Sequence, residues 1–179
     1  MSLLFSATDV SVHAGTECLV QPASLALHSG RPLTILGETG SGKSLLAQAI
    51  IGTLPAGLRA EGRVEVAGQV LDPGRPAAFR PLWGRQIGIL PQEPWLSLDP
   101  LMPAAAQVSE GHALVRRLPW ALARAAAAAD LAQLGLGQAG HRRPDQLSGG
   151  MAQRAAFAAA RAGGARIVIA DEPTKGLDA

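Results

Sequence analysis

An octapeptide in the first quarter of the chain carries the clearest chemistry. Residues 37–44 read GETGSGKS and match the phosphate-loop pattern G-x-x-x-x-G-K-[ST] at every fixed position. The glycines let backbone N–H groups converge on phosphate oxygens, and a helix starting near Gly42 points its positive dipole end at the same anion. Lys43 would bridge the β- and γ-phosphates, and the Ser44 hydroxyl would bind Mg²⁺. The alternative is a plain glycine turn between a strand and a helix. The candidate nucleotide-binding residues of the loop are Gly37, Glu38, Thr39, Gly40, Ser41, Gly42, Lys43 and Ser44.

A second pattern lies close to the C-terminal end of the sequence. Residues 167–172 read IVIADE, an apolar strand that ends in two carboxylates. Ligands of open α/β sheets bind at the carboxyl edge of the strands, which is where Asp171 would lie. Asp171 would hold Mg²⁺ through water, and Glu172 could polarise an attacking water as general base. Read alone, the pattern could also be a solvated strand end.

The spacing of apolar residues and the positions of glycines predict the strands and helices that would position these residues. Apolar runs separated by glycine turns predict strands in the first 36 residues, and the run 33–36 leads directly into the phosphate loop. Helical spacing after Gly42 predicts a helix that ends at Gly52. The further expected elements are two short antiparallel strands in 62–71, a buried strand in 85–92, an alanine-rich helical region over 104–134, a helix after 147 and a last strand in 167–170.

Composition bounds the class of protein. The chain has 179 residues, 47% of them hydrophobic, with a mean hydropathy of +0.17, which indicates a globular α/β domain. A net charge of +2 predicts neither a nucleic-acid footprint nor an anionic-lipid patch. Cys18 is the single cysteine, which favours a reducing compartment. With no transmembrane run and no secretory leader, we expect a cytoplasmic protein.

Three further motifs carry a resemblance to a known family. LSGGMAQR at 147–154 resembles the signature motif of ATP-binding-cassette (ABC) ATPases, and it lies between the phosphate loop and the IVIADE strand, as in that family. Gln92 is similar to the family's Q-loop glutamine, and GLD at 176–178 resembles its D-loop. An ordinary helix N-cap is the alternative interpretation of Ser148 and the residues that follow it.

The resemblance implies a fold and a mechanism. The fold would be α/β, a phosphate-loop NTPase with a RecA-like core, an antiparallel β-subdomain near 1–35 and 60–72, and an inserted helical subdomain near 93–160. Residues 1–179 would form a single nucleotide-binding domain. Ser148, Gly149 and Gly150 would face the γ-phosphate held by a second cassette, so that ATP joins a homo- or heterodimer. Asp178 would also contact nucleotide, Gln92 would sense the γ-phosphate or Mg²⁺, and Lys43, Gln92 and Glu172 would be the catalytic residues.

The stretch PQEPWLSLDPLMP, which begins at the end of the predicted strand 85–92, resembles the corresponding stretch of importer ATPases for dipeptides, oligopeptides and nickel. This resemblance implies transmembrane permease subunits as partners, indirectly a solute-binding protein, and a location on the inner face of the cell membrane. The alternatives are a soluble ABC ATPase of translation or DNA repair and a cassette that binds nucleotide without hydrolysing it. No nucleic acid is expected as a partner.

Two departures from the family pattern matter. Where the family places an aromatic that stacks on adenine, this sequence offers His13, whose imidazole could stack or could simply be structural. His28, His112 and His141 match no family element, and we expect them to be solvated or structural. The family continues past the D-loop to another strand and a switch histidine. We therefore expect the chain, which ends at Ala179, to be a truncated cassette that lacks the C-terminal part of the core and hydrolyses ATP weakly by itself.

Overall fold

The computed structural model of the chain describes residues 2–171. The chain forms two compact units, Met1–Leu82 and Trp83–Ala179.

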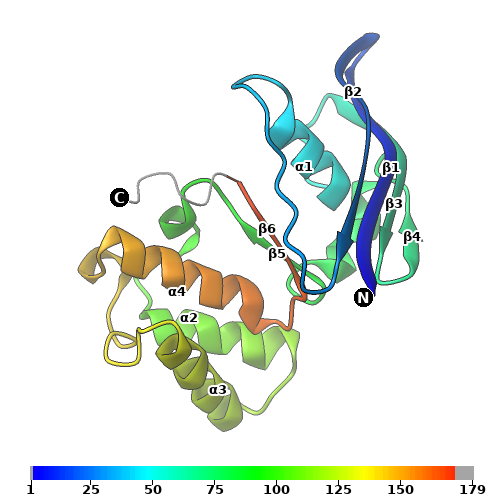
Figure 1. Cartoon of the computed structure of the whole chain (residues 1–179). Helices are drawn as coiled ribbons and strands as arrows, with labels where there is room; N and C mark the ends of the chain where they lie inside the picture. The colour runs from blue at the N-terminus through cyan, green and yellow to red at the C-terminus, as the bar shows by residue number, and fades with distance from the viewer. Residues whose placement is uncertain (1, 172–179) are drawn as a thin grey trace. The chain divides into compact units, whose positions relative to one another are not determined.

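The first unit is built on an antiparallel sheet. Its strands are β1 (Leu3–Ala14), β2 (Glu17–His28), β3 (Leu58–Val66) and β4 (Gln69–Leu71), in the order β2-β1-β3-β4 (Figure 1). Helix α1 (Lys43–Ile51) packs beside β1. Alternate apolar side chains of the strands are buried with one face of α1, as the period of two predicts for a half-covered sheet. This core comprises Phe5, Val10, Val12, Val64, Val66, Leu46, Ala49 and Ile50.

The second unit places helices beside a short parallel pair of strands. The strands are β5 (Ile87–Leu90) and β6 (Ile167–Ala170), and the helices are α2 (Ala104–Glu110), α3 (Trp120–Gln133) and α4 (Gly149–Ala162). The three helices pack on one another (Figure 1). Buried alanines of α4 recur at helical spacing, and their small side chains let neighbouring backbones approach closely. Two 3₁₀ turns, η2 (Pro94–Ser97) and η4 (Pro144–Gln146), lie between these elements, and another, η1 (Pro76–Leu82), ends the first unit.

Most elements predicted from the sequence are confirmed, but the strand expected at residues 33–36 is wrong. No strand among the described residues pairs with this run, and Leu33, Ile35 and Leu36 are 47%, 39% and 86% exposed. Strand propensity becomes a strand only where a neighbouring strand supplies backbone partners.

The helical region expected over 104–134 is also interrupted. After α2 the chain makes a π-helical turn, η3 (Gly111–Val115), and then leaves helical structure until α3 begins at Trp120. Pro119 lacks an N–H group and disfavours the helical conformation of Leu118, so it ends one helix and starts the next. The prediction followed the alanine composition and overlooked this proline.

Candidate functional site

The phosphate loop of residues 37–44 wraps around its own lysine. Lys43 Nζ donates to the carbonyl oxygens of Gly37 at 2.8 Å and Glu38 at 2.6 Å, and to Ser41 Oγ at 3.4 Å. Lys43 is also the first residue of α1, so the helix N-terminus and the ammonium group lie at the same place. Both are positive, which is the arrangement that binds an anion. The loop is largely exposed and therefore accessible to a ligand.

Gly42 has the backbone conformation that lets the phosphate loop lead directly into α1. It is the N-cap of α1 and has φ +86°, a conformation that costs a residue with a Cβ atom. A Cβ atom at this position would also lie 2.8 Å from Val20 Cγ2 on β2. The glycine thus permits both the left-handed turn and the close approach of the loop to the sheet.

Gln92 and Asp171 lie at one edge of the parallel strand pair. Leu90 of β5 pairs with Ala170 of β6, and the N–H of Asp171 donates to the Leu90 carbonyl at 3.2 Å. Parallel strands end at the same edge, so the residues that follow them become neighbours. The sequence placed each residue after a strand, and the pairing of β5 with β6 is what brings the two together.

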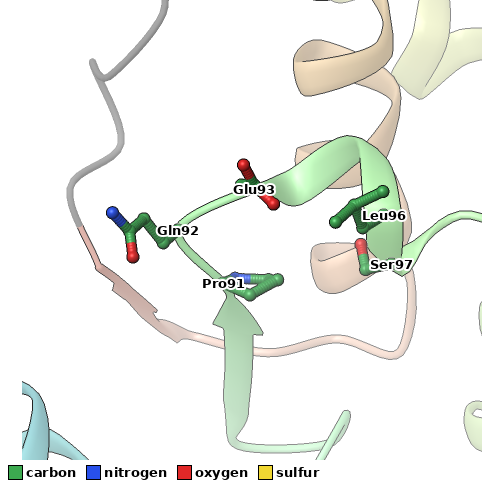
Figure 2. A pocket seen from close by; sticks show the side chains of 5 residues that line it. All are labelled: Pro91, Gln92, Glu93, Leu96 and Ser97. Atoms are coloured by element: carbon green, nitrogen blue, oxygen red, sulfur yellow. The ribbon is translucent and has the colours of Figure 1, made fainter.

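A shallow hollow opens beside Gln92. It has a volume of about 520 Å³ and is lined by Pro91, Gln92, Glu93, Leu96 and Ser97. Figure 2 shows Gln92 on the turn directly after β5, across the hollow from Leu96 and Ser97 of η2. An amide, a carboxylate and a hydroxyl therefore border the same space.

The signature-like segment forms a capped helix start. Ser148 is the N-cap of α4, with an extended backbone, and its Oγ accepts from the N–H of Met151 at 3.3 Å. Gly149 and Gly150 begin the helix, and Ser148 and Gly149 are exposed. The first turn of α4 thus presents backbone N–H groups that have no partner inside the helix, with no side chain from either glycine to cover them.

His13 lies on β1 among polar side chains. Its Nε2 is 3.0 Å from Ser11 Oγ and 3.9 Å from Glu61 Oε2 on β3, and its side chain is 20% exposed. Glu61 was not identified from the sequence, because only the register of β3 against β1 brings it there. His13 is therefore held in place, with part of its ring accessible.

The remaining predicted residues divide into two groups. Glu172, Asp178 and the rest of the GLD motif lie outside the described residues. The other histidines follow the expectation: His28 and His141 are exposed, and His112 is buried and hydrogen-bonded.

The donor chemistry fits magnesium only together with a bound anion. Among residues 2–171 there is no cluster of three or more His, Cys, Asp or Glu side chains that could hold a metal ion. The predicted ligands Ser44, Gln92 and Asp171 offer a hydroxyl, an amide oxygen and a carboxylate. These hard oxygen donors suit Mg²⁺, which commonly completes its octahedron with water and phosphate oxygens.

Comparison with known proteins agrees with this combination of loop, strand edge and capped helix. The family model "ABC transporter" matches residues 20–175. The oligopeptide transport ATP-binding protein OppD of Bacillus subtilis is 32% identical over 177 residues, covering 96% of this chain and 49% of that protein. The dipeptide transport ATP-binding protein DppD of Escherichia coli is 34% identical over 184 residues, covering 98% and 56%. The chain thus spans about half the length of these curated relatives.

A solved structure supports the fold. The dimeric post-hydrolysis state of the ATP-binding cassette MJ0796, bound to ADP and Pi, superposes with a TM-score of 0.78 at 27% identity, covering 98% of this chain and 77% of that one. The chain belongs to the ABC transporter family, and its relatives include ATP-binding proteins of oligopeptide and dipeptide transport. None of the helices in the described part of the chain is long and apolar enough to cross a membrane.

Proposed function

We propose that this protein binds and hydrolyses ATP as the nucleotide-binding subunit of an ABC importer. The observation that carries the proposal is the first turn of α4, where the Ser148 hydroxyl caps the Met151 N–H within the LSGGMAQR motif and Gly149 is exposed. Other phosphate-loop enzymes lack this motif, so it separates an ABC ATPase from a kinase or a GTPase. In this proposal residues 1–179 act as one nucleotide-binding domain.

The phosphate loop would hold the triphosphate of ATP. Lys43 would exchange the Gly37 and Glu38 carbonyls for β- and γ-phosphate oxygens, since charged oxygens accept stronger hydrogen bonds than neutral ones. The N–H groups of the loop and of the first turn of α1 would complete the cradle. His13 would stack on the adenine ring.

Ser44, Gln92 and Asp171 would hold Mg²⁺, with Asp171 acting through water. When bound, the ion would neutralise charge on the phosphates and orient the γ-phosphoryl group for in-line attack. Glu172 would accept a proton from the attacking water, as the residue next to Asp171 on the chain. Gln92 would report the state of the γ-phosphate to the loop that lines the hollow.

A second cassette, identical or different, would complete the site. Ser148, Gly149 and Gly150 of one subunit would face the γ-phosphate held by the other, and Asp178 would also contact nucleotide. The related cassette MJ0796 was solved as a dimer, which supports this arrangement. ATP would then close the dimer, and hydrolysis would reopen it.

The names of the relatives support a proposal for the cargo class. Their names describe transport of oligopeptides and dipeptides, and another relative is named for import of glutathione. We infer that the cargo is a peptide, nickel or a related small solute, delivered by a solute-binding protein to membrane permeases. The subunit itself would lie in the cytoplasm, on the inner face of the cell membrane.

Replacement of the loop lysine tests the nucleotide site. Lys43→Ala removes an ammonium with two short loop contacts and should weaken ATP binding by roughly 10- to 100-fold, because charged hydrogen bonds contribute about 1.5–3 kcal/mol. Titration calorimetry with Mg·ATP measures the change, and Arg80→Ala on η1 serves as a control that should bind normally. Equal affinities for Lys43→Ala and Arg80→Ala would refute the site.

A separate experiment tests the importer role against the alternatives. A permease subunit that copurifies with the protein and raises its ATP hydrolysis would support transport. Copurification with ribosomes or DNA would favour a soluble ABC ATPase, and tight ATP binding without hydrolysis in the assembled dimer would favour a cassette that only binds nucleotide.

A further inference from the structure

One side chain of α2 ties down the segment that connects Gln92 to this helix. Gln107 lies on α2, and its Oε1 accepts from the N–H of Asp99 at 2.8 Å. Its Nε2 donates to the carbonyl oxygens of Asp99 at 3.0 Å and Met102 at 2.9 Å. A glutamine carboxamide has one acceptor oxygen and two N–H donors, so each of its polar groups is engaged. We call these hydrogen bonds the Gln107 clamp.

The clamp acts on a turn that is also held by burial. Asp99 Oδ1 accepts from the N–H of Leu101 at 2.8 Å, which closes the turn. Leu98, the residue before Asp99, is 5% exposed and belongs to the same buried cluster as Ala152 and Ala155 of α4. Residues 98–102 are therefore fixed to the helices of the second unit.

The other end of the segment is fixed by the strand pair. Gln92 directly follows β5, whose Leu90 pairs with Ala170 of β6. Residues 93–97 lie between the two fixed ends, and Glu93, Leu96 and Ser97 line the hollow beside Gln92 (Figure 2). A short stretch of chain with both ends held has few conformations open to it. The shape of this stretch thus depends on the clamp.

Helix α2 is bonded in turn to the residues that precede the LSGGMAQR motif. Its N-cap is Pro103, which makes no side-chain cap. Instead, the N–H of Ala104 donates to the Arg142 carbonyl at 2.9 Å, and the N–H of Ala105 donates to the Gly140 carbonyl at 2.8 Å. Backbone carbonyls of a distant segment thus satisfy N–H groups that side chains often cap. That segment leads through η4 to Ser148, so α2 connects the Gln92 segment with the start of α4.

We propose that Gln107 is a positioning residue for ATP hydrolysis. By holding residues 93–102 on α2, the clamp makes a displacement at Gln92 move together with the exposed start of α4. A permease subunit that docks on the hollow would contact a stretch whose shape the clamp maintains. This role rests on the proposed function, because it concerns the loop through which Gln92 would act. It adds a residue that no motif of the sequence singled out.

Two substitutions separate the hydrogen bonds of Gln107 from its size. Gln107→Glu keeps the size of the side chain but loses both donated bonds and places a charged oxygen near two carbonyls. Gln107→Met keeps the length of the side chain and removes every bond of the clamp. Gln133→Glu and Gln133→Met make the same changes at the exposed last residue of α3 and serve as matched controls.

Hydrogen exchange in the nucleotide-free protein tests the clamp itself. Gln107→Met should speed exchange of the Asp99 amide by about tenfold or more, because the bonds that keep this turn closed are gone. Gln133→Met should leave the rate within about twofold, as measured by NMR. Unchanged exchange of the Asp99 amide in Gln107→Met would overturn the proposal. The measurement needs neither ATP nor permease, so it is independent of the proposed function.

Steady-state kinetics of the complex with permease test the positioning role. Both Gln107 variants should lower kcat for ATP by about 10- to 100-fold and leave KM within about twofold, since the phosphate loop is unaltered. Both Gln133 variants should match the unaltered protein, and circular dichroism identifies any variant that has lost its fold. If Gln107 only fills space, Gln107→Glu should keep a normal kcat.

A normal kcat in both folded Gln107 variants, or a change confined to KM, would overturn the proposal while the proposed function stands. An unaltered complex that does not hydrolyse ATP would refute the proposed function, and the role of Gln107 with it.

Discussion

At the scale of single residues, sequence analysis succeeds where the contacts are local. Lys43 donates to carbonyls only five and six residues away, so the groups that this lysine contacts all lie within the octapeptide 37–44. His13 is the opposite case, because Glu61 comes from a strand 48 positions further along the chain. The neighbours of His112 show the same limit, since Asp130 lies on α3. No spacing rule encodes such partners.

The proposed adenine contact of His13 gives a prediction at this scale. Its ring is held by Ser11 and lies near Glu61, so it cannot swing freely, and stacking on a base is typically worth about 1–3 kcal/mol. His13→Ala should weaken ATP binding by about fivefold or more, and His13→Phe should preserve it. Fluorescence titration with an ATP analogue measures both variants. His28→Ala, at an exposed position on β2, is the control; unchanged affinity in His13→Ala would show that the histidine is purely structural.

At the scale of elements, the confirmed predictions include helices whose ends are marked in the sequence by a glycine or a serine. Helix α1 lies between Gly42 and Gly52, and α4 lies between its N-cap Ser148 and its C-cap Gly163. The run 33–36 shows why strands are harder: its residues favour β-structure, yet the described strands pair elsewhere. Long-range pairing also decided that Gln92 and Asp171 share an edge. Local chemistry thus predicts the start of an element, and only tertiary pairing fixes its neighbours.

A bulge in the antiparallel sheet gives the prediction at this scale. Asp9 on β1 and Gly62 on β3 both have positive φ, at 49° and 113°, where the register between the strands shifts. A Cβ atom on Gly62 would lie 2.6 Å from the Asp9 carbonyl oxygen and 2.8 Å from Val10 Cα. Since these are backbone atoms, Gly62→Ala should lower the free energy of unfolding by about 2–4 kcal/mol.

A second glycine separates the steric cost from the conformational cost. Gly57 has φ +89° but no atom within 4 Å of an added Cβ, so Gly57→Ala should cost only about 1 kcal/mol. Urea denaturation of both variants, followed by circular dichroism, measures the difference. Equal destabilisation would mean that strand β3 shifts to relieve the clash.

At the scale of the whole molecule, an average such as the net charge does not show where charged or exposed groups gather. The net charge of the chain is only +2, whereas Arg116, Arg117 and Arg124 place three exposed positive charges within nine residues. The exposed start of α4 is a second local feature that the composition of the chain does not show. Ser148 and Gly149 lie open to solvent, and in the proposed function their natural ligand is the nucleotide of another subunit. Charge and exposure must therefore be read by location.

The dimer gives the prediction at this scale. If Glu172 is the general base, Glu172→Gln should bind ATP without hydrolysing it. The closed dimer should then persist, because the ATP that holds the two subunits together is no longer hydrolysed. Sedimentation velocity with Mg·ATP should show a dimer for Glu172→Gln and a monomer without nucleotide. Adding Lys43→Ala to the same chain should restore the monomer, since the phosphate loop would no longer retain ATP. Glu110→Gln, at the end of α2, is the control and should behave like the unaltered protein. A Glu172→Gln chain that stays monomeric at saturating ATP would contradict the two-subunit site, even if the loop binds nucleotide as proposed.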